Sequence, residues 1–134
     1  MTTMGDSVAA DILPPETVRL LTEVGFLAAG RGMTEDAMTI MAGLKVLRPT
    51  RSAAYVGAAL AHLNADRAEE AVRVLREEAL PVVVDDVDTV RAFLALALKL
   101  DGRPRECAEE LDRIAPDSAD ETALRMARSL REAL

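Results

Sequence analysis

The sequence predicts an all-α fold built from paired helices, and three observations support this prediction. Ala, Leu, Val, Glu and Arg dominate the 134 residues, and four of these (Ala, Leu, Glu and Arg) lose little side-chain freedom in a helix. Apolar residues recur at helical spacing in seven stretches that short turns separate. The helices come in pairs, and the pairs recur at an interval of about 34 residues. We therefore expect one domain of helical hairpins.

The first 13 residues are small and polar, so we expect a flexible leader at 1–13 and a single helical domain at 14–134. The segment Pro14–Glu16 marks the start of the first helix. Proline is favoured in a first turn, and an acid stabilises the positive end of the helix dipole. Apolar residues continue at helical spacing from Val18, and the glycines of Gly30–Gly32 end this helix.

The second helix is expected to begin at Thr34, which is a good capping residue and is followed by two acids. It ends near Leu47, because Arg48–Thr50 contains a proline that stops the helix. The same order of helix, turn and helix then recurs. The next four helices are expected at about 52–63, 68–79, 87–100 and 104–114.

The end of the chain and one Val-rich stretch complete the assignment. Ser118 is followed three residues later by Glu121, the pattern of a capping box, so a final helix is expected at about 118–134. Val82–Val84 has the composition of a strand. A single strand would have no partner, so we expect a loop or an irregular helix start there.

Charge and composition exclude several classes of protein. There are 23 acidic residues against 16 Lys and Arg, and the resulting net charge of −7 disfavours nucleic-acid binding. No apolar run approaches the roughly 20 residues that cross a bilayer, and MTTMGDSVAADIL lacks the features of a signal peptide. The one cysteine, Cys107, cannot form an internal disulfide. We expect a cytoplasmic protein that does not insert into membranes.

Three turns give the register of the repeat. In each, a turn residue precedes a small residue by five positions, in the pairs Gly32–Ala37, Asp66–Ala71 and Gly102–Cys107. The interval from Ala37 to Ala71 is 34 residues. That from Ala71 to Cys107 is 36, and the two extra residues fall in the Val-rich loop. A helical hairpin of 34 residues has the spacing of the tetratricopeptide repeat (TPR), and the chain resembles this family.

The resemblance extends to single positions of repeats that begin at Val18, Ser52 and Asp88. The eighth and twentieth residues are small, namely Gly25, Ala59, Ala95, Ala37, Ala71 and Cys107. Leucine at these places would push the helices apart, at a cost of about 1–3 kcal/mol. Tyr55 fits the large apolar fourth position, whereas Arg91 departs from it. The resemblance implies a right-handed superhelix of three hairpins with a C-terminal capping helix.

In the TPR family the first helix of each hairpin lines a concave groove, and five positions per repeat carry over. The implied groove residues are Arg19, Thr22, Phe26, Ala29, Gly30, Ala53, Val56, Leu60, Leu63, Asn64, Thr89, Ala92, Leu96, Lys99 and Leu100. At the fifth and ninth positions they lack the Lys, Arg and Asn clamp with which co-chaperone TPR proteins hold a terminal carboxylate. This mostly apolar groove suits the apolar face of a partner helix. The alternative is that the leader, the last helix or a second copy of the chain covers these residues.

No constellation of residues indicates catalysis, so we expect no enzyme activity, no cofactor and no metal. His62 has no ligand partner at suitable spacing and is expected between repeats or at the groove rim. Cys107 occupies a packing position. The acids of Asp85–Asp88 are expected in a solvated loop, because their spacing is not that of a calcium loop. One cluster either fills the core or forms an adaptable binding surface: Met33, Met38 and Met41.

With three expected hairpins, a capping helix and a negative net charge, the chain resembles the small TPR-like chaperones of bacterial type III secretion. The resemblance spans about residues 15–134 and is carried by EVGFLAAGRG, LRPTRSAAYVGAALAHLN and the Ala71–Leu75 run. It implies a protein partner, namely a secreted, needle or export subunit with an apolar or amphipathic helix. The groove would bury this helix until the subunit is exported. The alternative is a generic TPR adaptor, or a homodimeric scaffold without a role in secretion.

Overall fold

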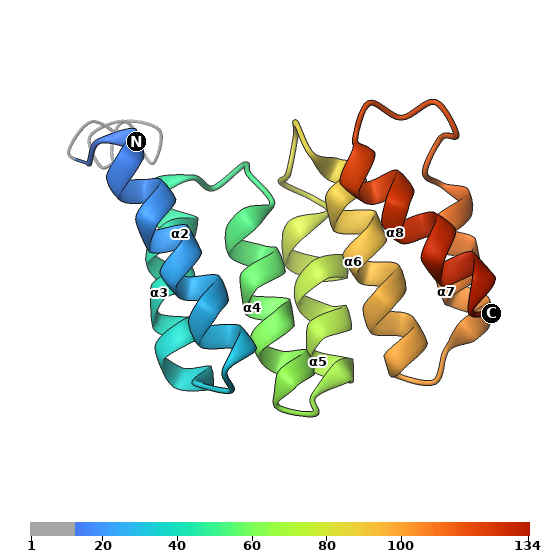
Figure 1. The fold of residues 1–134 in the computed structure, drawn as a ribbon, viewed down its shortest axis with the longest axis horizontal. Coiled ribbons are helices and arrows are strands. Elements are labelled where there is room, and N and C mark those ends of the chain that lie inside the picture. Colours follow the sequence, from blue (N-terminus) through green and yellow to red (C-terminus); the bar gives the residue numbers. More distant parts are fainter. Residues whose placement is uncertain (1–12) are drawn as a thin grey trace.

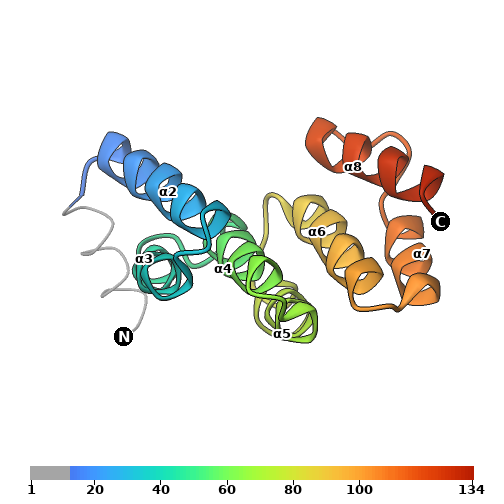
Figure 2. The ribbon, with the colours of Figure 1, turned by 60° about the horizontal axis from the view of Figure 1, so that its bottom comes forward.

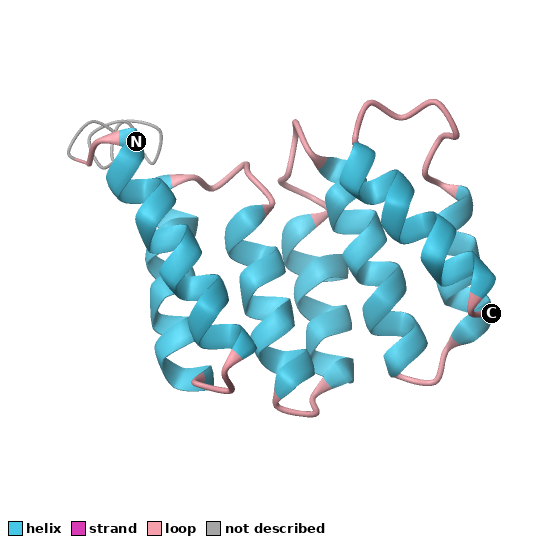
Figure 3. Ribbon diagram, in the orientation of Figure 1, coloured by secondary structure: helices cyan, strands magenta, loops and turns pink. Residues whose placement is uncertain are grey.

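The computed structural model describes residues 13–134, and this part of the chain is helical except for its connecting turns (Figure 1, Figure 3). The described part contains no strand, so the all-α prediction is confirmed, and Val82–Val84 lies in a loop. The expected leader, apart from Leu13, lies outside the described residues. The helices are α2 (Pro15–Gly30), α3 (Thr34–Leu47), α4 (Ala53–Asn64), α5 (Ala68–Arg73) continuing as η1 (Val74–Ala79), α6 (Val87–Leu100), α7 (Pro104–Asp112) and α8 (Glu121–Glu132).

The helices form hairpins that contact one another in chain order. α2 pairs with α3, α4 with α5 and η1, and α6 with α7, while α8 packs on α6 and α7. Figure 2 shows two layers, with α2, α4, α6 and α8 in one and α3, α5 and α7 in the other. The first layer curves, so that α2 and α8 stand at its two ends. The packing order is that of stacked hairpins; the right-handed sense of the superhelix stays a prediction.

The turns inside the three hairpins are copies of one another. Gly32, Asp66 and Gly102 all adopt the left-handed conformation, with φ of 76°, 62° and 73°. The next amide in each turn donates to the carbonyl five residues back, in the pairs Met33–Ala28 (2.9 Å), Arg67–His62 (2.8 Å) and Arg103–Leu98 (2.8 Å). This is the Schellman closure of a helix, for which glycine is the preferred residue. The register inferred from these three turn residues therefore corresponds to a repeated geometry.

Small residues allow the hairpins to approach closely, as the sequence predicted. The side chains at the eighth and twentieth positions are buried. A methyl group on Gly25 would lie under 3.0 Å from the Cε atom of Met41, and one on Gly57 would lie under 3.0 Å from both Cε and Sδ. Met41 therefore occupies space that two glycines leave open, one on α2 and one on α4. The role of Gly57 was not predicted.

The core is continuous through the stack, and α6 lies at its centre. α6 contacts α4, α5, η1, α7 and α8, so side chains from most sides of the helix are buried. Leu94 and Leu98 are fully buried there, as are Leu75 of η1 and Leu111 of α7. One core cluster extends from Val18 to the buried face of α8.

Two helices differ from their expected form. The helix expected at 68–79 is α-helical only to Arg73 and then widens into the π-helical turn η1, in which the Leu80 amide donates to the Leu75 carbonyl at 3.0 Å. The expected capping box at the last helix is wrong. Asp120, not Ser118, caps α8, and its side chain accepts a hydrogen bond from the Ala123 amide at 2.9 Å.

The acids before α6 connect the starts of successive helices in the α2–α4–α6–α8 layer. Asp86 accepts hydrogen bonds from the Ser52 amide (3.1 Å) and hydroxyl (2.6 Å) at the start of α4. Asp120 in turn accepts a hydrogen bond from the Thr89 hydroxyl of α6, and Asp88 accepts one from Ser118 at 2.6 Å. Of the three acids expected in a solvated loop, Asp86 and Asp88 instead join neighbouring units of the stack, whereas Asp85 is exposed.

Arg91 departs from the expected apolar residue because it has a charged partner in the same hairpin. Its guanidinium lies 3.0 Å from the carboxylate of Glu110, which is almost fully buried and also binds Arg113 at 2.7 Å. An ion pair therefore links α6 and α7 at this position.

Candidate binding surface

The residues predicted to form the groove lie on α2, α4 and α6, which share one layer of the fold (Figure 2). We call eleven of these fifteen residues the trough; the other four, Ala29, Gly30, Asn64 and Leu100, lie at or near the C-terminal ends of their helices. The trough comprises Arg19, Thr22, Phe26, Ala53, Val56, Leu60, Leu63, Thr89, Ala92, Leu96 and Lys99. Arg19 is exposed, Val56 and Ala92 are buried, and the others are partly exposed. The trough is therefore a surface with a buried floor.

The apolar part of the trough is a stripe of three large side chains. Phe26 of α2, Leu60 of α4 and Leu96 of α6 are each packed against the core and each remain partly exposed. They come from successive helices of the same layer, so the stripe crosses all three hairpins. Such a row offers apolar contacts to a partner that lies across the helices.

Two polar members of the implied groove bind helix ends instead. The Asn64 amide donates to the Ala29 carbonyl at 2.8 Å, and the Lys99 ammonium lies 3.4 Å from the Ala133 carbonyl. Both carbonyls lie at the C-terminal ends of helices, where backbone acceptors lack partners. These two side chains therefore stabilise neighbouring helices.

The last helix does not cover the trough over α2 and α4. Within residues 13–134, α8 contacts only α6 and α7. It instead extends the surface, because Leu96 and four residues of α8 line a mostly apolar hollow of about 260 Å³: Arg125, Met126, Ser129 and Leu130. These residues were not predicted, because the last helix was expected only to cap the stack.

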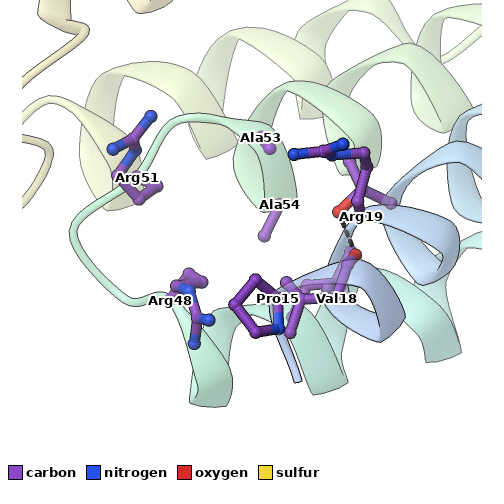
Figure 4. A pocket seen from close by; sticks show the side chains of 9 residues that line it. Pro15, Val18, Arg19, Arg48, Arg51, Ala53 and Ala54 are labelled. Carbon is purple, nitrogen blue, oxygen red and sulfur yellow. Dashed lines mark hydrogen bonds between the residues drawn. The ribbon is translucent and has the colours of Figure 1, made fainter. Parts of the chain in front are cut away.

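A basic pocket opens at the other end of the trough (Figure 4). It has a volume of about 460 Å³ and is lined by Pro15, Val18, Arg19, Thr22, Leu44, Arg48, Arg51, Ala53 and Ala54. Three of these residues, Arg19, Thr22 and Ala53, belong to the trough. The arginines come from α2, from the end of α3 and from the turn before α4, and no acid is among the lining residues.

The three arginines of the basic pocket have few partners of their own. Among the described residues no carboxylate lies within ion-pair distance of Arg19 or Arg48. Arg48 donates to the Leu47 carbonyl at 2.8 Å. Arg51 lies 3.8 Å from Asp85, and both side chains are largely exposed, so this pair contributes little.

A second apolar surface, the outer face, lies on the first hairpin. Leu20 and Leu27 of α2 are 59% and 54% exposed, and Val24 and Met33 are also exposed. A hollow of about 400 Å³ lies on this face, lined by Val24, Leu27, Ala28, Arg31, Met33, Asp36, Thr39 and Ile40. The methionine cluster is divided, because Met41 fills the core whereas Met33 belongs to this surface.

His62 and Cys107 lie apart from the trough. Burial lowers the pKa of His62 below its ordinary value of 6.5, with Glu70 opposing and Arg67 and Arg73 adding to the shift. These groups lie on or next to α5, the second helix of the same hairpin. Burial also raises the pKa of the Cys107 thiol. No cluster of metal-ligating side chains occurs between residues 13 and 134.

Comparison of the chain with protein-family models, with curated proteins and with solved structures found no match. In the described part of the chain, no helix has the length and apolar character required to cross a bilayer.

Proposed function

We propose that this chain is a cytoplasmic, TPR-like chaperone of a bacterial type III secretion system. It holds an apolar helix of a secreted, needle or export subunit in the trough. The observation that carries the binding role is the stripe of Phe26, Leu60 and Leu96, which stays partly exposed and which α8 does not cover at α2 and α4. The secretion role rests on the sequence resemblance alone.

The trough is suited to hold a helix through a few large anchors. Completing the burial of each stripe side chain contributes roughly 1 kcal/mol, about half the value for burying a whole Leu or Phe. Helices pack with their axes about 8–10 Å apart, so a single partner helix can rest on neighbouring members of the layer. A client helix covered in this way is withheld from self-association until it is released.

Charged substitutions in the stripe test the proposal. We expect Phe26→Asp and Leu96→Asp to lose the partner that co-purifies with the parent protein from its native host, identified by mass spectrometry. Val46→Asp is the matched control, because Val46 is exposed on α3 in the other layer. Circular dichroism establishes that each variant is folded. Folded stripe variants that retain the partner as the control does would refute trough binding.

The secretion role has a separate test. Genes for a secretion ATPase, for ring proteins or for a short helical needle subunit are expected beside the gene for this chain. A gene neighbourhood without them favours the alternative of a generic adaptor.

The outer face favours a second candidate, a homodimeric scaffold. Leu20, Val24 and Leu27 form an exposed apolar row on α2, and terminal hairpins of a repeat stack need a covered outer surface. In that case Leu20→Asp converts a dimer into a monomer in sedimentation experiments, whereas Leu96→Asp does not. A monomeric parent protein excludes this candidate.

A further inference from the structure

The basic pocket differs from the two equivalent junctions of the α2–α4–α6–α8 layer. Between the starts of α4 and α6 the chain places the carboxylate of Asp86, and between those of α6 and α8 it places that of Asp120. Between the starts of α2 and α4 the corresponding residue is Ser52, whose hydroxyl already donates to Asp86. This junction therefore has no carboxylate of its own and is lined by three arginines instead.

The clustered positive charge is unusual in this protein. The chain has a net charge of −7, yet Arg19, Arg48 and Arg51 line one hollow that contains no acid. Most arginines in the second half of the chain lie within 3.5 Å of a carboxylate, namely Arg73, Arg76, Arg91, Arg103 and Arg113. Arg19 and Arg48 have no such partner among the described residues, and they line one hollow with Arg51 (Figure 4). Guanidinium groups bind carboxylates in paired, charge-assisted hydrogen bonds.

The floor of the basic pocket is apolar. Val18, Leu44 and Ala54 are buried apolar residues that line the hollow. The Thr22 hydroxyl already donates to the Val18 carbonyl at 2.7 Å. The remaining side-chain donors that line the pocket are the three arginines.

The pocket is continuous with the trough, because Arg19, Thr22 and Ala53 belong to both. A segment that rests between Phe26 and Leu60 and runs along α2 and α4 towards the starts of these helices, roughly 10 Å away at 1.5 Å per residue, would enter it. We propose that the basic pocket binds acidic side chains of the partner segment whose apolar face occupies the trough. This inference rests on the proposed function. It adds that the partner carries acids at one end and is held in a single orientation.

A carboxylate-bearing protein fits the basic pocket better than a nucleic acid. The chain itself fills the two equivalent junctions with Asp carboxylates, and its overall negative charge repels a phosphate chain. The site combines a small charged hollow with an apolar stripe, which matches an amphipathic helix with an acidic end.

Two fluorescent peptides test the inference with the full chain. Both are about 18 residues long, or five turns, and carry Leu at helical spacing; one has two Glu in its first turn and the other has Gln there. We expect the parent protein to bind the Glu peptide roughly tenfold more tightly in anisotropy titrations. The preference is expected to disappear in about 1 M salt, where charges are screened beyond about 3 Å.

The triple variant Arg19→Gln, Arg48→Gln, Arg51→Gln is expected to bind both peptides as the parent binds the Gln peptide. The matched control replaces three exposed arginines that form no ion pair in the described residues, Arg67, Arg105 and Arg128, and keeps the tenfold preference. Equal binding of both peptides by the parent overturns the inference but leaves trough binding intact. Failure of both peptides to bind overturns trough binding as well. Displacement of the Glu peptide by inorganic phosphate or a short DNA strand at low micromolar concentration overturns the choice of a carboxylate.

Discussion

Gly57→Ala is expected to destabilise the protein although alanine is the better helix former. The added methyl group would meet three atoms of Met41, with Cε and Sδ under 3.0 Å away and Cγ at 3.1 Å. Met41 is fully buried, and it cannot turn towards α2 because its Cε atom already fills the space beside Gly25. Overpacking costs about 1–3 kcal/mol, and the gain in helix propensity is about 1 kcal/mol. We expect a net loss of roughly 1–2 kcal/mol in the free energy of unfolding.

Gly43→Ala is the matched control, because it adds the same methyl group in the interior of α3. Nothing lies within 4 Å of that methyl position, and Gly43 is exposed. This variant should gain up to about 1 kcal/mol. Urea unfolding followed by circular dichroism measures both changes, and the Tm of Gly57→Ala should fall by roughly 3–8 °C.

A double-mutant cycle identifies Met41 as the cause. Met41→Ala alone should cost about 2–5 kcal/mol, because it leaves a cavity. Combined with Gly57→Ala, it should cost less than the sum of the two single changes, because the methyl group enters the vacated space. If Gly57→Ala is as stable as Gly43→Ala, or if the two losses simply add, the proposed packing of Met41 between two glycines is incorrect.

The remaining predictions concern charge, pH and backbone. Glu110→Ala should cost about 1–3 kcal/mol in urea unfolding, because Arg91 loses its partner, and replacing both residues with Leu should recover most of this loss; no recovery would argue against the ion pair as the cause. The unfolded chain protonates His62 near pH 6.5, whereas burial lowers its pKa in the folded state, so stability present above pH 6.5 should decline as the pH falls towards 5. His62→Gln should show a flatter profile over this interval, and identical profiles would contradict the assignment. Asp66→Gly should raise stability by about 0.5–1 kcal/mol, because φ is 62° there, and Asp66→Ala should not.

Local signals in the sequence predicted most of the fold. The hairpin turns were found because glycine or aspartate at a left-handed position precedes each second helix, and this chemistry acts within a few residues. The bounds of α3 and α6 were predicted correctly. The widening of α5 into η1 was not, because nothing in the run VLREEA differs from an ordinary helix.

The candidate site was predicted only where it follows the repeat. Position counting placed Phe26, Leu60 and Leu96 in one layer, because the helical period determines which side chains share a face. Arg48 and Arg51 were missed because they lie in a turn outside the repeat pattern. They line the same hollow as Arg19 only because of tertiary folding. The pairing of Arg91 with Glu110 was missed for the same reason, since 19 residues separate them.

The hydroxyl-to-carboxylate links at the starts of α4, α6 and α8 make the array extensible. Ser52 donates to Asp86 and Thr89 donates to Asp120, so each unit offers a donor that only a following unit can satisfy. A hairpin duplicated from residues 52–85 would leave the first Ser52 facing a second serine, and an aspartate in place of that second serine could accept its hydrogen bond but could no longer donate to Asp86. A duplicated hairpin that keeps both links therefore needs two changes in the copy, the aspartate and a hydroxyl three residues later, the arrangement that Asp86 and Thr89 provide.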